Sequence, residues 1–131
     1  MRITQIRRLL LVSLCLAGSA KADVTAEDFV AKTTQNLLNL CTASPQDKQY
    51  REAIHFCQGY LVGAYQYYAA ASSNNPSLQI VCFPEPKPSR NEAIEQFISW
   101  TQKHPEYLNE NPVETEFRFL SEKWPCNPSK I

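Results

Sequence analysis

The sequence predicts an all-α fold, a small bundle of about four helices stapled by two disulfides. Apolar residues recur at spacings of three and four in four segments, and proline- or asparagine-containing breaks separate these segments. Four cysteines remain after an export signal, and an even number in an exported chain is typical of a disulfide framework: Cys41, Cys57, Cys82 and Cys126. A domain of this size gains stability from cross-links.

Residues 1–22 have the features of a cleavable secretory signal. A basic head precedes an apolar run that is far shorter than the ~20 residues of a membrane-spanning helix. Small residues fit cleavage near Ala22, with cleavage after Ala20 as the alternative. Cys15 leaves with the signal, and a lipoprotein is disfavoured because Leu14 precedes that cysteine. We therefore expect a periplasmic protein with one domain, residues 23–131.

The mature domain is mildly acidic. Removal of the signal leaves nine basic residues against 13 acidic ones. Nucleic acids and anionic lipids bind clusters of Lys and Arg, so neither is expected as a partner, and no stable membrane insertion is expected. A basic partner suits this charge better.

The first two helices are expected over residues 25–40 and 44–71. Thr25 with Asp28 approaches a capping box for the first, and Ser44 is a suitable N-cap for the second. The second helix carries a long apolar stripe, which predicts the central helix of the bundle: Tyr50, Ile54, Cys57, Leu61, Ala64, Tyr68 and Ala71.

A break separates these helices from the last two. Residues 72–76 are turn formers, residues 78–83 are expected to be extended, and the three prolines of 84–88 predict a stiff connector. Ser89 with Glu92 forms a capping box for a third helix to about residue 102.

Asn111 and Pro112 open a fourth helix, which Pro125 ends. The inner face of the third helix is expected to hold Ala93, Ile94, Phe97, Ile98 and Thr101. The apolar spacing of the fourth helix predicts an inner face of Val113, Phe117, Leu120 and Trp124.

Chain geometry ranks the disulfide pairings. From Cys57 to Ala71 the second helix climbs roughly 21 Å at ~1.5 Å per residue. The residues from Ala71 to Cys82 can retrace that distance when extended, at ~3.3 Å each. We therefore expect Cys57 to pair with Cys82 and Cys41 with Cys126, and a Cys41–Cys57 link would contradict this expectation.

The sequence contains no evident catalytic or metal-binding constellation. His55 and Cys57 are two residues apart on a helix and point to different faces, so they do not make a nucleophile–base pair. No zinc spacing is present, and we expect no metal, no cofactor and no enzymatic activity. Five glutamates are interpreted as helix caps or a solvated helix face: Glu92, Glu95, Glu110, Glu114 and Glu116.

The second helix also bears Gly59 and Gly63, one turn apart. Such a pair lets another helix approach closely, either within the chain or across a homodimer. Part of a tyrosine-rich belt on this helix is expected in the core, and the remainder is a candidate dimer surface.

Several strings occur in one order along the chain. They are Phe56-Cys57-Gln58-Gly59-Tyr60 with Gly63, Cys82-Phe83-Pro84, His104-Pro105-Glu106 and Pro125-Cys126. In this order they resemble the Rap/Tai family of immunity proteins, which protect against type VI secretion amidase effectors. The resemblance spans about residues 41–126. The connector after Cys82 departs from it, since it holds three prolines where the family is shorter and more glycine-like.

The resemblance implies a periplasmic protein that binds a Cys/His peptidoglycan amidase and blocks its active-site cleft. Two segments are candidates for the blocking projection, residues 72–76 and residues 104–111. We favour the second, because it groups an aromatic anchor with carboxylates and an amide: Glu106, Tyr107, Asn109 and Glu110. A solvated interhelical loop is the plainer interpretation. The alternative function is a small periplasmic chaperone or stress-response protein.

Overall fold

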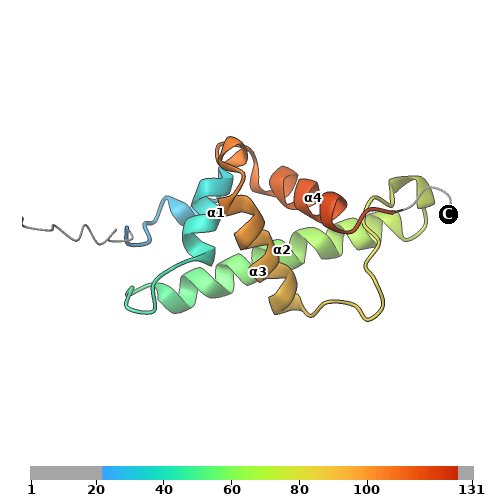
Figure 1. The fold of residues 1–131 in the computed structure, drawn as a ribbon. Coiled ribbons are helices and arrows are strands. Elements are labelled where there is room, and N and C mark those ends of the chain that lie inside the picture. The colour runs from blue at the N-terminus through green and yellow to red at the C-terminus, as the bar shows by residue number, and fades with distance from the viewer. Residues whose placement is uncertain (1–21, 127–131) are drawn as a thin grey trace, which may run out of the picture.

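The computed structural model describes residues 22–126, and within them it confirms the all-α fold with four helices. These are α1 (Thr34–Cys41), α2 (Tyr50–Ser72), α3 (Arg90–Gln102) and α4 (Pro112–Lys123), as Figure 1 shows. Three short 3₁₀ turns accompany them: η1 (Asp28–Val30), η2 (Pro76–Leu78) and η3 (Pro105–Tyr107). The expected signal, apart from Ala22, lies outside the described residues.

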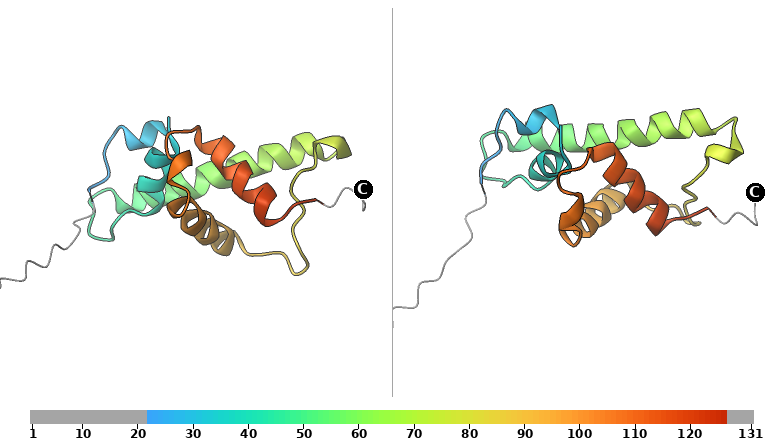
Figure 2. Two further views of the ribbon diagram at one scale, coloured as in Figure 1. Left: turned by 45° about the horizontal axis from the view of Figure 1, so that its top comes forward. Right: turned by 90° about the horizontal axis from the view of Figure 1, so that it is seen from above.

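The long helix α2 is the central element. Helices α1, α3 and α4 each contact it, and they lie on one side of it in the view from above in Figure 2. The C-terminal end of α2 extends past the other helices in all views (Figures 1 and 2). No helix among residues 22–126 is long and apolar enough to cross a membrane.

The first two helices begin later than expected. Ala31 has a left-handed backbone (φ 49°), which ends η1, and Thr33 then caps α1 in a capping box with Asn36. Before α2, the Asp47 carboxylate accepts hydrogen bonds from the amides of Val24 and Gln49, at 2.7 Å each. These bonds hold the residues before Tyr50 in turns instead of a helix.

The last two helices begin at the predicted residues. Ser89 and Glu92 form the capping box of α3, and the Asn111 side chain accepts from the Val113 amide at the start of α4. The expected inner face of α4 is partly wrong, because Val113 is 38% exposed. Its buried face instead holds Pro112, Thr115, Glu116, Phe119 and Leu120.

The predicted disulfide pairing is wrong: the bonds are Cys41–Cys57 and Cys82–Cys126. Cys41 is the last residue of α1, and α1 folds back against α2 so that its Cα lies 5.1 Å from that of Cys57. The segment between Ala71 and Cys82 is long enough to reach Cys57. It does not run back along α2, because other contacts hold residues 80–82 near the end of that helix.

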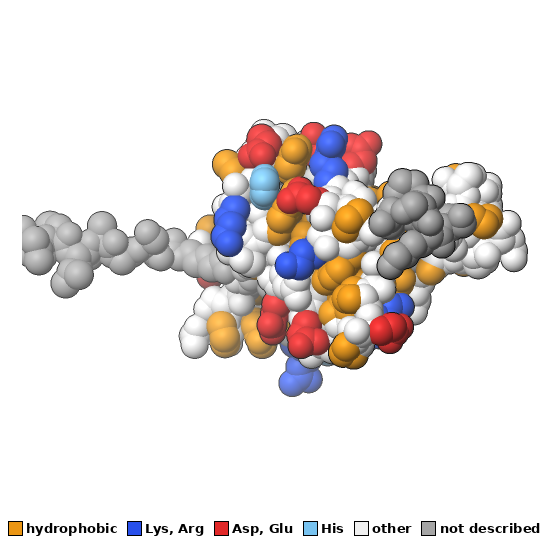
Figure 3. All heavy atoms as spheres, turned by 45° about the vertical axis from the view of Figure 1, so that its right-hand side comes forward, with side chains coloured by type: hydrophobic (Ala, Val, Ile, Leu, Met, Phe, Trp, Pro, Cys, Tyr) orange, Lys and Arg blue, Asp and Glu red, His pale blue; other side chains and the backbone are white. Residues whose placement is uncertain are grey.

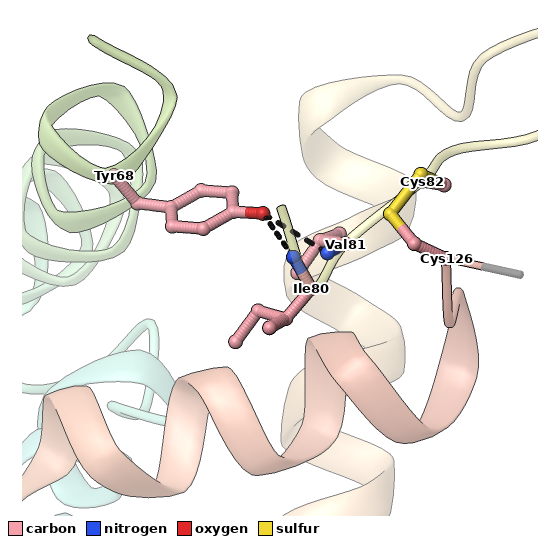
Figure 4. Close-up of a disulfide and its surroundings, with 5 residues drawn as sticks. All are labelled: Tyr68, Ile80, Val81, Cys82 and Cys126. Atoms are coloured by element: carbon pink, nitrogen blue, oxygen red, sulfur yellow. Dashed lines mark hydrogen bonds between the residues drawn. A yellow bond between two sulfur atoms is a disulfide. The ribbon is translucent and has the colours of Figure 1, made fainter. Parts of the chain in front are cut away.

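Those contacts lie near the C-terminal end of α2 (Figure 4). The Tyr68 hydroxyl accepts hydrogen bonds from the amides of Ile80, at 2.8 Å, and Val81, at 3.0 Å. Val81 forms an antiparallel bridge with Pro125, and this bridge sets Cys82 beside Cys126. Tyr68 is three turns beyond Cys57, so the anchored strand-like segment cannot reach that cysteine.

The core lies where α1, α3 and α4 meet α2. Leu37, Leu40 and Ala53 are fully buried, as are the rings of Phe97 and Phe119, whose centroids are 5.8 Å apart. The aromatic contacts continue through Trp124, 5.6 Å from Phe119. Burial of each of these leucine and phenylalanine side chains stabilises the bundle by roughly 1.5–3 kcal/mol.

Candidate partner-binding site

The segment 104–111 connects α3 to α4 and contains the four residues expected to bind a partner. Helix α3 ends at Gln102, and Pro105 opens η3 because proline suits a first turn that lacks an internal hydrogen-bond acceptor for its amide. This tight turn brings His104 and Tyr107 back over the end of α3.

Three rings stack at this turn. The Trp100 ring, from α3, is nearly parallel to that of Tyr107, with centroids 5.6 Å apart and an angle of 5°. The His104 ring also stacks on Trp100, at 4.1 Å. The guanidinium of Arg118, which belongs to α4, lies 5.0 Å from the centroid of the Tyr107 ring. Tyr107 is therefore held by two helices.

The two carboxylates of the segment have partners within the chain. His104 Nδ1 lies 3.0 Å from the Glu106 carboxylate, and this contact lowers the pKa of Glu106. The Arg118 Nε donates to Glu110 at 3.0 Å. These pairs are exposed, so their main effect is to orient the side chains and not to stabilise the fold.

The backbone of the segment is fixed to α1. The amides of Thr34 and Gln35, in the first turn of α1, donate to the carbonyls of Glu110 at 2.8 Å and Leu108 at 2.9 Å. First-turn amides have no acceptor within their own helix, so the segment supplies what α1 lacks. The Thr34 hydroxyl adds a buried 2.7 Å bond to that of Thr115.

The structure therefore brings the four expected residues together on an anchored turn. Glu106 and Asn109 are exposed, while Tyr107 and Glu110 are partly buried against α4. The segment is also a solvated connection between two helices, with Glu106 and Asn109 exposed, and its backbone is fixed by these contacts. Of the four expected residues, Glu106 and Asn109 are therefore the more accessible to another molecule.

The second expected projection, residues 72–76, lies at the protruding end of α2 (Figure 1). Ser72 is buried and donates to the Tyr68 carbonyl at 2.8 Å, and Asn75 caps η2. Exposed apolar side chains accompany this end: Tyr67 is 79% exposed and Leu78 is 50% exposed. Tyr67 belongs to the tyrosine-rich belt of which part was expected at the surface, whereas the exposure of Leu78 was missed because it fell in a segment expected to be extended.

The charges on the face in Figure 3 are interspersed. Lys and Arg side chains alternate there with Asp and Glu, and hydrophobic side chains lie between them. Such a face favours a partner whose own charges are arranged in a complementary pattern, and it does not attract partners of one overall charge sign.

Gly59 and Gly63 are exposed on α2, and an added Cβ at either would meet nothing within 4 Å in the described chain. No helix among residues 22–126 uses the close approach that these glycines allow.

One glutamate contradicts its expected place on a solvated face. Glu116 is only 4% exposed, and burial raises the pKa of its carboxyl to about 8. Its position beside Thr115 and Phe119 on the inner face of α4 was not evident, because the apolar spacing favoured Val113. No group of three or more His, Cys, Asp or Glu in the described residues is arranged to hold a metal ion.

The fold and the anchored turn define a small, disulfide-linked helical protein suited to binding another molecule. Residues 33–126 match the model of the Rap1a immunity proteins, and the chain belongs to this family. The match runs from the cap of α1 to Cys126 and so includes all four helices and both disulfides. No curated protein and no solved structure matches the chain.

Proposed function

We propose that the protein is a periplasmic immunity protein that binds a type VI peptidoglycan amidase effector and blocks its active-site cleft with residues 104–111. Family membership supports the immunity role. The observation that carries the choice of segment is its attachment to α1 through Thr34 and Gln35.

An anchored turn is a favourable inhibitor. A loop that is ordered only on binding costs conformational entropy, and an already fixed one avoids that cost. Glu106 and Asn109 project from this turn and offer a carboxylate and an amide to the catalytic histidine expected in the amidase. The protein itself then needs no catalytic group, and we propose that it is not an enzyme.

Inhibition tests this proposal directly. Mature oxidised protein is titrated into purified Cys/His amidases from type VI systems while peptidoglycan hydrolysis is followed. We expect complete inhibition of one cognate amidase at one protomer per enzyme. Failure to inhibit any of these amidases would contradict the proposed role.

The exported state forms part of the proposal. We propose that residues 1–22 are removed during export, so that the periplasmic protein starts at Asp23. The intact mass of the protein recovered from periplasm identifies its first residue. We expect the mass of a chain that starts at Asp23, and the alternative cleavage would give a chain that starts at Lys21.

A homodimer through α2 is proposed from the exposed Gly59 and Gly63, which leave room for a second helix. Light scattering of the mature protein gives its mass. A monomer at all concentrations would exclude this arrangement.

The apolar end of α2 favours one other function, that of a periplasmic chaperone. Exposed Tyr67, Leu78 and Ile80 are side chains of the kind that bind unfolded chains. A chaperone would suppress aggregation of a reduced, carboxymethylated protein, whereas the immunity protein is expected to have no such effect.

A further inference from the structure

A cavity of about 300 Å³ lies between α2, α3, α4 and the proline-rich connector, away from residues 104–111. Its walls are mostly apolar and come from three helices: Leu61 of α2, Phe97 of α3, and Phe119 and Leu120 of α4. This volume is at the lower end of those that bind small organic ligands.

A carboxyl group lines this otherwise apolar space. Glu116 is 4% exposed, and its Oε2 has no hydrogen-bond partner within residues 22–126. An unpaired buried polar atom is costly, and a bound donor would remove that cost. The immunity role proposed above makes no use of this residue.

Few other charges lie near Glu116. The Tyr60 hydroxyl of α2 is close enough that the negative charge of Glu116, after burial, raises its pKa. Lys87 of the connector and Arg90 of α3 line the same cavity, while α1 carries no charged side chain. Neither cation forms an ion pair with Glu116 in the described structure.

Two aromatic rings also line the cavity. Tyr65 and Phe83 meet edge to face with centroids 5.3 Å apart. The Lys87 ammonium lies 4.9 Å from the Phe83 centroid and 5.6 Å from that of Tyr65. The protein thus already holds one ammonium group against these rings, where cation–π attraction favours it.

We propose that this cavity binds a primary ammonium group on a short apolar stem, with Glu116 as its hydrogen-bond acceptor and Tyr65 and Phe83 along its path. Above pH 8, where Glu116 is largely ionised, an anionic ligand would meet its carboxylate unfavourably. A neutral apolar ligand would leave that carboxyl unpaired, and a quaternary ammonium has no N–H to donate. The ammonium group belongs either to a free amine or to a lysine side chain of a bound protein.

Titration of the mature oxidised protein with n-pentylamine, followed by ¹H–¹⁵N NMR shifts at pH 8, tests this proposal. We expect shifts of the amides around Glu116 and Phe83, and at least tenfold weaker binding of 1-pentanol. Glu116→Gln should weaken pentylamine binding at least tenfold. The control Glu114→Gln, on an exposed residue of the same helix, should leave it unchanged.

The pH dependence gives a second readout on the unaltered protein. Glu116 must lose its proton before it pairs with an ammonium, so affinity for pentylamine should rise up to tenfold per unit toward pH 8. Affinity for 1-pentanol should not rise. This series decides the matter even if Glu116→Gln does not fold.

Nα-acetyl-lysine amide distinguishes the two sources. Binding of this compound as well as pentylamine supports a lysine side chain, and binding of pentylamine alone supports a free amine. Equal binding of pentylamine and 1-pentanol, no binding of either amine, or full affinity in Glu116→Gln would overturn the proposal.

Discussion

The backbone amide of Thr34 donates a 2.8 Å hydrogen bond to the carbonyl of Glu110, which joins the first turn of α1 to the segment before α4. The Thr34 hydroxyl donates to the same carbonyl at 3.1 Å. One residue of α1 therefore fixes the end of the turn that carries Glu106 and Asn109.

Replacement of Thr34 by valine should destabilise the fold. Valine has the same shape but removes the buried 2.7 Å bond between the Thr34 and Thr115 hydroxyls and the 3.1 Å bond to the Glu110 carbonyl, and Thr115 keeps only a 3.5 Å bond to the Tyr107 carbonyl. Each lost hydrogen bond costs about 0.5–1.5 kcal/mol, so the free energy of unfolding in urea should fall by about 1–3 kcal/mol. Ser99→Ala, at an exposed position of α3, is the control and should change it by less than ~0.5 kcal/mol. Equal stability of Thr34→Val and the parent would contradict a contribution of the Thr34 hydroxyl to this anchor.

Stability should decline as the pH rises from 4.5 to 8. Burial raises the pKa of Glu116 from 4.5 to about 8, so the folded protein keeps a proton that the unfolded chain loses. The Glu116 contribution is full below pH 4.5 and is lost by up to ~1.4 kcal/mol per unit as the pH approaches 8.

Thermal unfolding of the parent and Glu116→Gln over this pH range measures that contribution. The glutamine variant has no carboxyl to titrate there, so its curve should be flatter, whereas Glu114→Gln should follow the parent. A decline of the same slope in Glu116→Gln would assign the effect to other groups.

Loss of Cys82–Cys126 should destabilise the chain more than loss of Cys41–Cys57. The first bond closes a loop with a separation of 44 residues and the second one of 16, so the chain-entropy model gives ~4 and ~3 kcal/mol. Paired alanine variants compared in urea check the order. Peptide mapping of the non-reduced protein should first yield the Cys41–Cys57 link, and a Cys57–Cys82 link would contradict the fold near Tyr68.

Alanine at Gly59 or Gly63 should stabilise the protomer. An added Cβ meets nothing in the described chain, and alanine favours a helix interior by about 1 kcal/mol over glycine. Thermal unfolding of dilute protein tests this. A destabilised variant would mean that the space is filled by a second copy, which light scattering of the same sample would detect.

Local sequence patterns predicted the parts of the fold that depend on neighbours in the chain. The capping box of Ser89 with Glu92 and the Asn111 cap set the starts of α3 and α4, because each cap bonds to amides two or three residues away. The start of α2 was misplaced, since Asp47 bonds to Val24, 23 residues earlier.

The features that sequence patterns did not predict depend on contacts between residues far apart in the chain. The disulfide pairing depends on the Tyr68 hydroxyl holding Ile80 and Val81, and reach along the chain alone does not reveal that bond. The burial of Glu116 depends on which face of α4 meets α2 and α3. The four candidate residues lie together between α3 and α4, and their binding role stays a prediction. Their anchoring to Thr34 was not foreseen, because 76 residues separate Thr34 from Glu110.

The affinity of a Glu106→Ala/Asn109→Ala variant for the cognate amidase is the most direct test of the proposed inhibition. Both residues are exposed, so the fold should be unchanged, and Asn74→Ala at the protruding end of α2 is the matched control. We predict at least a tenfold loss of affinity for the double variant and none for the control. Unchanged affinity of the double variant, with a loss in Asn74→Ala, would place the contact at the end of α2 and contradict our account.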